Sequence, residues 1–311
     1  MIEISETSMI FHKKGIGKAD EREDFKALDN ITLTIPDGCI YGFLGSNGAG
    51  KSTLLRMICG IYKTERGSVR IDGEDVFNNP AAKAKVFFVN DETIQYAGFT
   101  LDGLARYYAS YYDTFSRETY ERLVAKIGLP RNKRMSDFSK GMKRQAVVVI
   151  GLSCYTKYLL LDEAFDGLDP AMRRFIKQII VGELVDREAT LVVSSHNITE
   201  INELCDRAIL IHRGQMIFAD EIDKIKSGFG KLQLGRSGGA VTPEELKDAG
   251  LDVVQYSADG SVARAVIRGS EEEINARSAA FGCEIRELIP LTLEEIFIYE
   301  LEARGYGSDI L

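Results

Sequence analysis

Apolar and polar positions in the first part of the chain alternate with a period of two. Ile31, Leu33 and Ile35 alternate with Thr32 and Thr34, which is typical of a strand with one buried face. The other strands predicted in this part lie at residues 2–11, 40–44, 67–71 and 85–90. A charged stretch at residues 12–24 predicts an exposed loop. This part of the chain is therefore expected to be rich in β-structure.

The apolar period becomes helical between residues 99 and 138. Leu101, Leu104 and Tyr108 recur at helical spacing, and a second helix is predicted between a Ser116 cap and Gly128. The tyrosines here could form a surface for stacked bases, but aromatic side chains at helical spacing more often belong to a core. We therefore predict a small helical insert at about residues 99–138.

From residue 139 onward, apolar strands alternate with helices. Strands are predicted at residues 158–161 and 189–193, with a helix at residues 171–185 between them. Near-continuous apolar strands that alternate with helices indicate a parallel sheet covered on both faces. A hairpin is then predicted from residues 207–212 and 215–218.

Glycine-rich segments at residues 227–230 and 235–239 predict a domain boundary near residue 227. The expected domains are therefore residues 1–226 and 227–311. In the second domain, strands are predicted at residues 231–234, 253–256, 262–268 and 283–289, and helices after the caps Thr242, Ser270 and Thr292. This order suggests a small α+β module of the ferredoxin-like kind with one extra helix at its end.

The charge of the chain argues against nucleic acid as a partner. The 39 basic and 47 acidic residues give a net charge of -8, and no block of lysine and arginine stands apart from acidic neighbours.

The cysteines and the apolar runs predict a cytoplasmic protein. The five cysteines are an odd number without metal-ligand spacing, as expected of thiols in a reducing compartment. The N-terminus lacks the features of a signal peptide, and no apolar run approaches the roughly 20 residues that a membrane span needs. Any work at a membrane would then need a second chain that supplies the spans.

The segment GSNGAGKST lies between an apolar strand and a helix. Glycines there allow successive amide groups to face a polyphosphate, and the helix N-terminus adds partial positive charge. Lys51 is expected to reach the β- and γ-phosphates, and the Ser52 hydroxyl to hold Mg²⁺. The predicted phosphate-binding residues are Gly45, Ser46, Asn47, Gly48, Ala49, Gly50, Lys51, Ser52 and Thr53.

A second candidate feature is the acidic pair that ends the strand at residues 158–161. A buried carboxylate beside a phosphate needs a cation, which makes Asp162 a candidate Mg²⁺ ligand. Glu163, one residue further, could face the γ-phosphate and polarise or deprotonate a water molecule. An acidic pair alone can be a simple turn, so the prediction depends on its combination with the glycine loop.

These motifs, together with FSKGM, GLDP and SSH in the same order, resemble the ATP-binding subunit of a bacterial ABC transporter over roughly residues 1–220. The resemblance implies an α/β fold of the P-loop NTPase class, an ABC cassette with a mixed core sheet, an antiparallel β part and a helical insert. It also implies an ATPase with ATP and Mg²⁺ as ligands. Two such cassettes are expected to bind two ATP molecules between them, head to tail.

The same resemblance assigns roles to further residues. The signature segment Ser139, Lys140, Gly141 and Met142 would contact the ATP bound by the partner cassette, although Lys140 and Met142 depart from the family's usual residues. Asp169 would lie at the dimer seam. His196 would contact the γ-phosphate and act with Glu163 in catalysis.

Two assignments are less direct. Asp91 stands where the family usually has a glutamine that lines the site, which leaves its coupling role open. The aromatic residue that stacks on adenine is expected to be Phe11, with Phe25 as the alternative.

The expected function is an ATPase subunit that drives a separate membrane permease. The SKGMK signature and the short C-terminal module are similar to exporters of the antibiotic-resistance and bacteriocin-immunity type. The chain would then lie at the inner face of the membrane and pair with a second cassette. The alternatives are a soluble ABC ATPase without a transport role and a regulatory nucleotide switch.

Overall fold

The computed structural model describes residues 1–12, 24–90, 96 and 98–306, and these residues form two compact units. The first unit comprises residues 1–197 and 209–219, and the second comprises residues 198–208 together with residues from 220 onward. This division differs from a single cut at residue 227, because two helices before that position belong to the second unit. They are α7 (Ile198–Leu204) and α8 (Ile222–Ser227).

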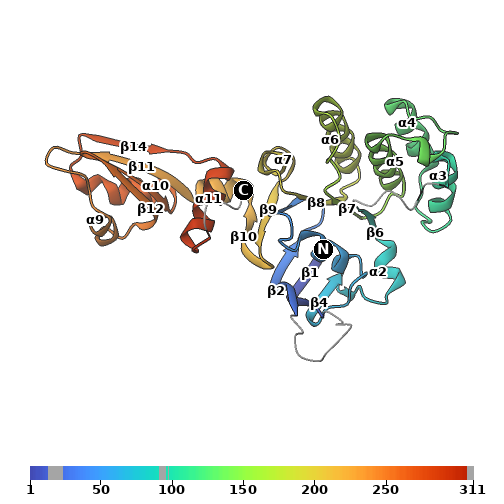
Figure 1. Ribbon diagram of the computed structural model, residues 1–311, viewed down its shortest axis with the longest axis horizontal. Helices are drawn as coiled ribbons and strands as arrows, with labels where there is room; N and C mark the ends of the chain where they lie inside the picture. Colours follow the sequence, from blue (N-terminus) through green and yellow to red (C-terminus); the bar gives the residue numbers. More distant parts are fainter. Residues whose placement is uncertain (13–23, 91–95, 97, 307–311) are drawn as a thin grey trace, which may run out of the picture. The chain divides into compact units, whose positions relative to one another are not determined.

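An antiparallel sheet forms one part of the first unit (Figure 1). Its strand order is β2-β1-β4-β5, with β1 (Ile2–Phe11), β2 (Phe25–Ile35), β4 (Arg66–Ile71) and β5 (Glu74–Asp75). The alternation in β2 buries Ile31, Leu33 and Ile35 and leaves the two threonines between them exposed. The predicted β-rich first part of the chain is therefore confirmed.

A six-stranded sheet forms the other part, with the order β10-β9-β3-β8-β7-β6. The strands are β3 (Ile40–Leu44), β6 (Val86–Val89), β7 (Tyr158–Asp162), β8 (Thr190–Ser195), β9 (Arg207–His212) and β10 (Gln215–Glu221). Strands β3, β8, β7 and β6 pair in parallel, and every residue of β7 and β8 is buried. The parallel pairing brings the carboxyl ends of β3, β7 and β8 to one edge, where the loops that follow them meet.

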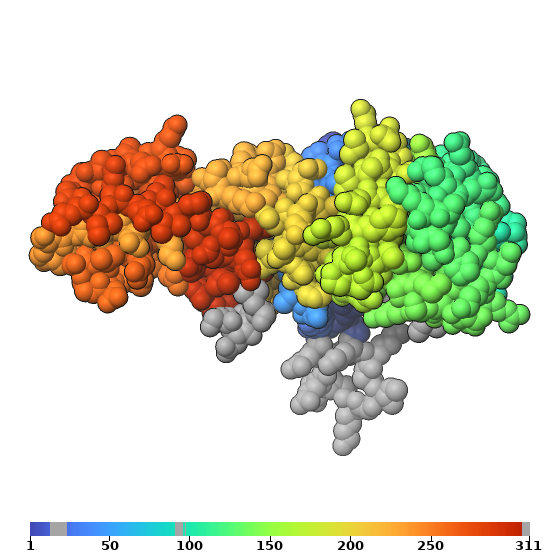
Figure 2. Space-filling view, turned by 90° about the horizontal axis from the view of Figure 1, so that it is seen from above, coloured from blue at the N-terminus to red at the C-terminus, as the bar shows by residue number. Residues whose placement is uncertain are grey.

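Helices complete the first unit. They are α1 (Lys51–Ile58), α2 (Pro80–Ala84), α3 (Leu101–Ala109), α4 (Arg117–Ile127), α5 (Lys140–Ser153) and α6 (Pro170–Val185). The predicted insert contains α3 and α4, and α4 has the expected caps at Ser116 and Gly128. Figure 2 shows the insert beside α6, and Arg122 of α4 donates two hydrogen bonds to Glu183 of α6, at 2.6 and 2.9 Å.

The second unit contains a four-stranded antiparallel sheet of order β12-β13-β11-β14. Its elements follow the order β-α-β-β-α-β-α: β11 (Phe229–Gly235), α9 (Pro243–Asp248), β12 (Asp252–Asp259), β13 (Val262–Arg268), α10 (Glu271–Ser278), β14 (Ile285–Ile289) and α11 (Leu293–Ala303). The first six elements have the order of a ferredoxin-like module. Thr242, Ser270 and Thr292 each form a capping box with the glutamate three residues later.

Within the described ranges, no helix is both long enough and apolar enough to cross a membrane.

Candidate functional site

The glycine loop between β3 and α1 requires glycine at particular positions. Gly48 and Gly50 have φ angles of 79° and 112°, in the left-handed region that other residues rarely adopt. A Cβ atom at Gly50 would lie 2.7 Å from the carbonyl oxygen of Ala27, and one at Gly45 would lie 2.3 Å from that of Ile211. The loop therefore packs so closely on neighbouring backbone that side chains cannot be accommodated at these two positions.

Lys51 begins α1, and its side chain is only 3% exposed. Its Nζ atom donates hydrogen bonds to the carbonyl oxygens of Gly45, at 2.6 Å, and Ser46, at 3.1 Å. The same atom lies 3.6 Å from Oε1 of Glu163. Burial lowers the pKa of Lys51, and the nearby carboxylates of Glu163 and Asp162 oppose this effect. The ammonium group is thus held above the loop in an acidic environment.

Asp162 is the last residue of β7 and is 1% exposed. Its Oδ1 atom accepts hydrogen bonds from the hydroxyls of Ser52, at 2.9 Å, and Ser194, at 2.6 Å. Its Oδ2 atom is buried and has no hydrogen-bond partner among the residues that the structure describes. A buried carboxylate oxygen of this kind is costly unless a cation or a donor reaches it.

Glu163 adopts an unusual backbone conformation, with a φ angle of 46°. Its amide donates a hydrogen bond of 3.0 Å to the Ser194 hydroxyl. Its Oε1 atom lies 3.8 Å from Nδ1 of His196, whose side chain is exposed. One side-chain ligand atom each from Glu163, Asp166 and His196 lies within 4.8 Å of the other two. The side chains of the predicted pair, Glu163 and His196, therefore lie close together, and the Asp166 carboxylate lies beside them.

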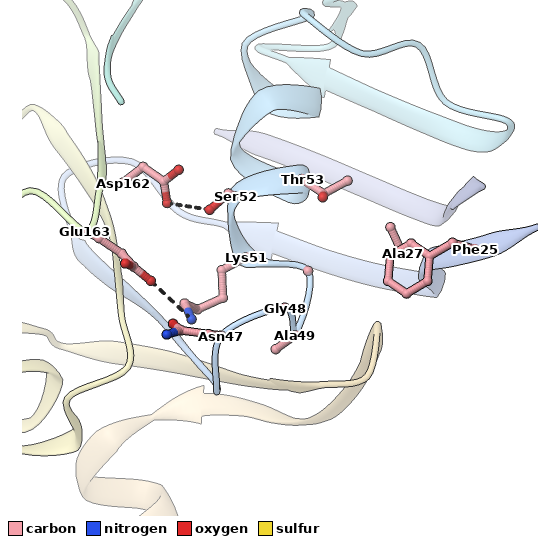
Figure 3. A pocket seen from close by; sticks show the side chains of 11 residues that line it. Phe25, Ala27, Asn47, Gly48, Ala49, Lys51, Ser52, Thr53, Asp162 and Glu163 are labelled. Carbon is pink, nitrogen blue, oxygen red and sulfur yellow. Dashed lines mark hydrogen bonds and ion pairs between the residues drawn. The ribbon is translucent and has the colours of Figure 1, made fainter. Parts of the chain in front are cut away.

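A pocket of about 270 Å³ joins these groups (Figure 3). Its lining includes the loop from Asn47 to Thr53, the acidic pair Asp162 and Glu163, and Phe25 and Ala27 of β2. Phe25 is 57% exposed. Phe11 is absent from this lining and packs edge-on against Tyr62, with ring centroids 5.6 Å apart. The aromatic ring that lines the pocket is therefore that of Phe25, the alternative to the expected Phe11.

The remaining predicted residues lie outside this pocket. Ser139 caps α5 and accepts a hydrogen bond of 3.2 Å from the amide of Met142. Asp169 caps α6 and accepts one of 2.9 Å from the amide of Met172. Ser139, Lys140 and Asp169 are exposed, and Gly141 is partly exposed. Asp91 lies outside the described residues.

Comparison with known proteins shows which family the chain belongs to. The family described as ABC transporter matches residues 28–166. The ABC transporter ATP-binding protein NatA of Bacillus subtilis (strain 168) is 31% identical over 213 residues, which cover 66% of this chain and 86% of NatA. The chain belongs to the ABC transporter ATP-binding proteins. This family membership confirms the expected ATPase activity and the P-loop cassette fold.

Other relatives of this ABC ATPase extend the comparison. The bacitracin transport ATP-binding protein BcrA of Bacillus licheniformis is 28% identical over 286 residues, covering 88% of this chain and 92% of BcrA. A solved ATP-binding cassette, titled as a dimer in a post-hydrolysis state bound to ADP and Pi, has a TM-score of 0.62 at 20% identity. It covers 71% of this chain and 98% of its own, and it supports the fold.

Sequence reasoning did not name Asp166, and it gave Ser194 and Phe25 a smaller part than the structure does. Asp166 lies three positions after Glu163, and a search for further acids near the pair would have found it. Ser194 was treated only as part of a motif, although its hydroxyl contacts both acidic residues. Phe25 was identified only as the alternative to Phe11.

Proposed function

We propose that this chain is the ATP-hydrolysing subunit of an ABC exporter, and that it pairs head to tail with a second cassette to drive a separate membrane permease. The observation that carries the proposal is the single pocket in which Lys51, Ser52, Asp162 and Glu163 meet. Transport is also supported by the name of the relative BcrA, a bacitracin transport protein. In this role the chain would be cytoplasmic and would lie at the inner face of the membrane through its permease.

ATP binding is assigned to the glycine loop and to Phe25. The loop amides and the N-terminus of α1 provide positive partial charge for the phosphates, and Lys51 adds a full charge that is already held beside them. Phe25 lies on the side of the pocket away from Asp162 and Glu163 (Figure 3), where its exposed ring can stack on adenine. Phe25 therefore replaces Phe11 in the proposed adenine site.

The residues around Asp162 fit a magnesium ion. Mg²⁺ prefers oxygen ligands, and Asp162 presents a buried carboxylate oxygen beside the Ser52 hydroxyl. Ser52 and Asp162 would hold the ion, directly or through water. When bound, Mg²⁺ neutralises charge that develops on the β- and γ-phosphates.

Water activation is assigned to Glu163. Its carboxylate lines the pocket, where it can orient a water molecule toward the γ-phosphate and accept its proton. Lys51 and His196 lie 3.6 and 3.8 Å from it, close enough to fix the position of the carboxylate and of the phosphate.

We assign contact with the partner cassette to the exposed signature segment, residues 139–142. Ser139 and Lys140 lie at the exposed N-terminus of α5, which is suited to an anion from another molecule. Asp169 lies at the exposed N-terminus of α6, where we place the dimer seam. None of these three residues lines the pocket of its own chain, which supports a role toward the second ATP.

We assign binding of the permease to a groove lined largely by tyrosines of the insert. The groove has a volume of about 520 Å³ and is lined by Pro80, Lys83, Ala84, Tyr96, Tyr107, Tyr108, Tyr111 and Tyr112. Tyr107 and Tyr111 are exposed, although Tyr107 contacts Phe99 and both neighbouring tyrosines. An exposed aromatic groove suits the apolar face of a short helix, here a cytoplasmic helix of the permease.

Two measurements test this proposal. Purified wild-type chain should release phosphate from ATP, and Lys51→Ala should lose this activity. In the host cell, wild-type chain should sediment with membranes, Tyr111→Ser should shift to the soluble fraction, and the exposed Tyr155→Ser should behave as wild type. Turnover without membrane association would favour a soluble ABC ATPase, and nucleotide binding without turnover would favour a regulatory switch.

A further inference from the structure

The hydroxyl of Ser194 bonds directly to both acidic residues of the site, Asp162 and Glu163. Ser194 lies in β8 and has no exposed surface. Its Oγ atom donates to Oδ1 of Asp162 at 2.6 Å and accepts from the amide of Glu163 at 3.0 Å. Ser194 itself faces neither the pocket nor the solvent, so any effect on the reaction must pass through these two residues.

The hydrogen bond to the Glu163 amide supports an unfavourable backbone conformation. Strand β7 ends at Asp162, which pairs with Ser194 in the parallel ladder. The amide of Glu163 is therefore the first one beyond the strand, and the Ser194 hydroxyl accepts its hydrogen bond where the ladder ends. Glu163 also has a φ angle of 46°, and such strain persists only where the surroundings enforce it.

The hydrogen bond to Asp162 fixes one carboxylate oxygen. Oδ1 receives two hydroxyl donors, from Ser52 and Ser194, while Oδ2 has no hydrogen-bond partner in the described part of the chain. Ser52 is itself a proposed magnesium ligand, and its oxygen can bind the ion through a lone pair while its O–H still donates to Oδ1. Ser194 is the second donor to Oδ1, and it has no proposed role as a ligand, so its hydroxyl serves only to hold the two acidic residues.

We propose that Ser194 is a positioning residue for ATP hydrolysis, whose hydroxyl holds the Asp162 carboxylate and the Glu163 backbone in their working arrangement. The inference rests on the proposed function, because that function assigns the roles of Asp162 and Glu163. A simpler interpretation is that the hydroxyl only satisfies buried polar groups and contributes to stability alone.

The matched pair Ser194→Thr and Ser194→Val separates these interpretations. Both variants add bulk at a buried position, and they differ only in whether a hydroxyl remains. Turnover should be about 10- to 100-fold lower in the valine variant than in the threonine variant, the size expected for a hydrogen bond to a charged group, with KM for ATP changed less than about threefold. Ser194→Ala gives a third variant if both larger side chains prevent folding.

A binding measurement adds a readout that does not depend on turnover. In a Glu163→Gln background, ATP affinity is measured by calorimetry with Mg²⁺ and with a chelator. The valine variant should lose part of the Mg²⁺-dependent gain in affinity and should keep the affinity measured with the chelator, because the loop amides are unchanged.

Thr190→Val is the control for loss of a buried hydroxyl on the same strand. Thr190 lies at the start of β8, where its Oγ1 accepts from the amide of Gly38 at 2.9 Å and donates to the carbonyl oxygen of Pro36 at 3.5 Å. This variant should lower the free energy of unfolding without lowering turnover. Equal turnover in the threonine and valine variants, together with an equal Mg²⁺ effect, would overturn the inference. If Lys51→Ala also hydrolysed ATP normally, the proposed function itself would fail.

Discussion

Phe25→Ala tests the adenine site, and Phe11→Ala is its matched control. Phe25 lines the pocket beside the glycine loop and is 57% exposed, so its removal should cost little core packing. Stacking of a base on an aromatic side chain contributes about 1–3 kcal/mol by alanine substitution. The dissociation constant for ATP should therefore rise about 5- to 150-fold. Because the exposed ring covers one face of the base, we expect a value of about tenfold within that range.

Phe11→Ala should lower the free energy of unfolding and leave ATP affinity nearly unchanged, the reverse of what we expect for Phe25→Ala. Its ring makes an edge-on contact with Tyr62, and such aromatic pairs contribute about 0.5–1.5 kcal/mol. The free energy of unfolding should fall by a similar amount, about 1 kcal/mol, while ATP affinity stays within about twofold of wild type.

The assay is equilibrium binding of ATP and of inorganic tripolyphosphate, with unfolding by urea measured in parallel. Tripolyphosphate has no base, so Phe25→Ala should leave its affinity unchanged. The reasoning is refuted if Phe11→Ala weakens ATP binding more than Phe25→Ala does. It is also refuted if Phe25→Ala weakens both ligands equally, because the effect would then act on the phosphate loop.

Three further predictions concern the first unit. Leu160→Ala should lower the free energy of unfolding by about 2–5 kcal/mol, measured by urea, because this central-strand side chain is fully buried. Gly50→Ala should abolish ATP binding in calorimetry while the circular dichroism spectrum stays native, because its Cβ would lie 2.7 Å from the Ala27 carbonyl oxygen. The pKa of the Asp72 carboxyl is shifted by two opposing effects. Partial burial raises this pKa, but hydrogen bonds from Lys157, the N-terminal amine, Tyr158 and Lys85 lower it by a larger amount, so the net shift is downward. The stability that this carboxylate contributes should thus be present above about pH 4 and lost as pH falls below it. In Asp72→Asn, the free energy of unfolding measured with urea should therefore fall less steeply with pH below about pH 4 than in wild type.

The elements that local patterns specify could be predicted from the sequence. The alternation at Ile31, Leu33 and Ile35 predicted a half-buried strand, and the apolar strand before Asp162 predicted a central one. The caps at Ser116 and Thr242 predicted where helices begin. Each of these features depends on residues within one turn or one strand, so neighbours in the sequence were sufficient.

The site required information about which strands pair. Ser194 reaches Asp162 because β7 and β8 are adjacent and in register, which no local pattern specifies. Phe11 and Phe25 pair directly between β1 and β2, yet only Phe25 lines the pocket, and the sequence does not specify which strand lies beside the glycine loop. The unit boundary depended on tertiary packing as well, because α7 belongs to the second unit although it lies well before the predicted boundary at residue 227.

The most direct test of the central claim is ATP hydrolysis by purified wild-type chain and Glu163→Gln across a range of protein concentrations, with dimerisation followed by light scattering. Wild-type turnover should rise with the square of protein concentration at the low end. Glu163→Gln should not turn over but should form a stable dimer with ATP. Linear turnover by a monomer, or wild-type turnover in Glu163→Gln, would contradict a two-cassette ATPase in which Glu163 activates water.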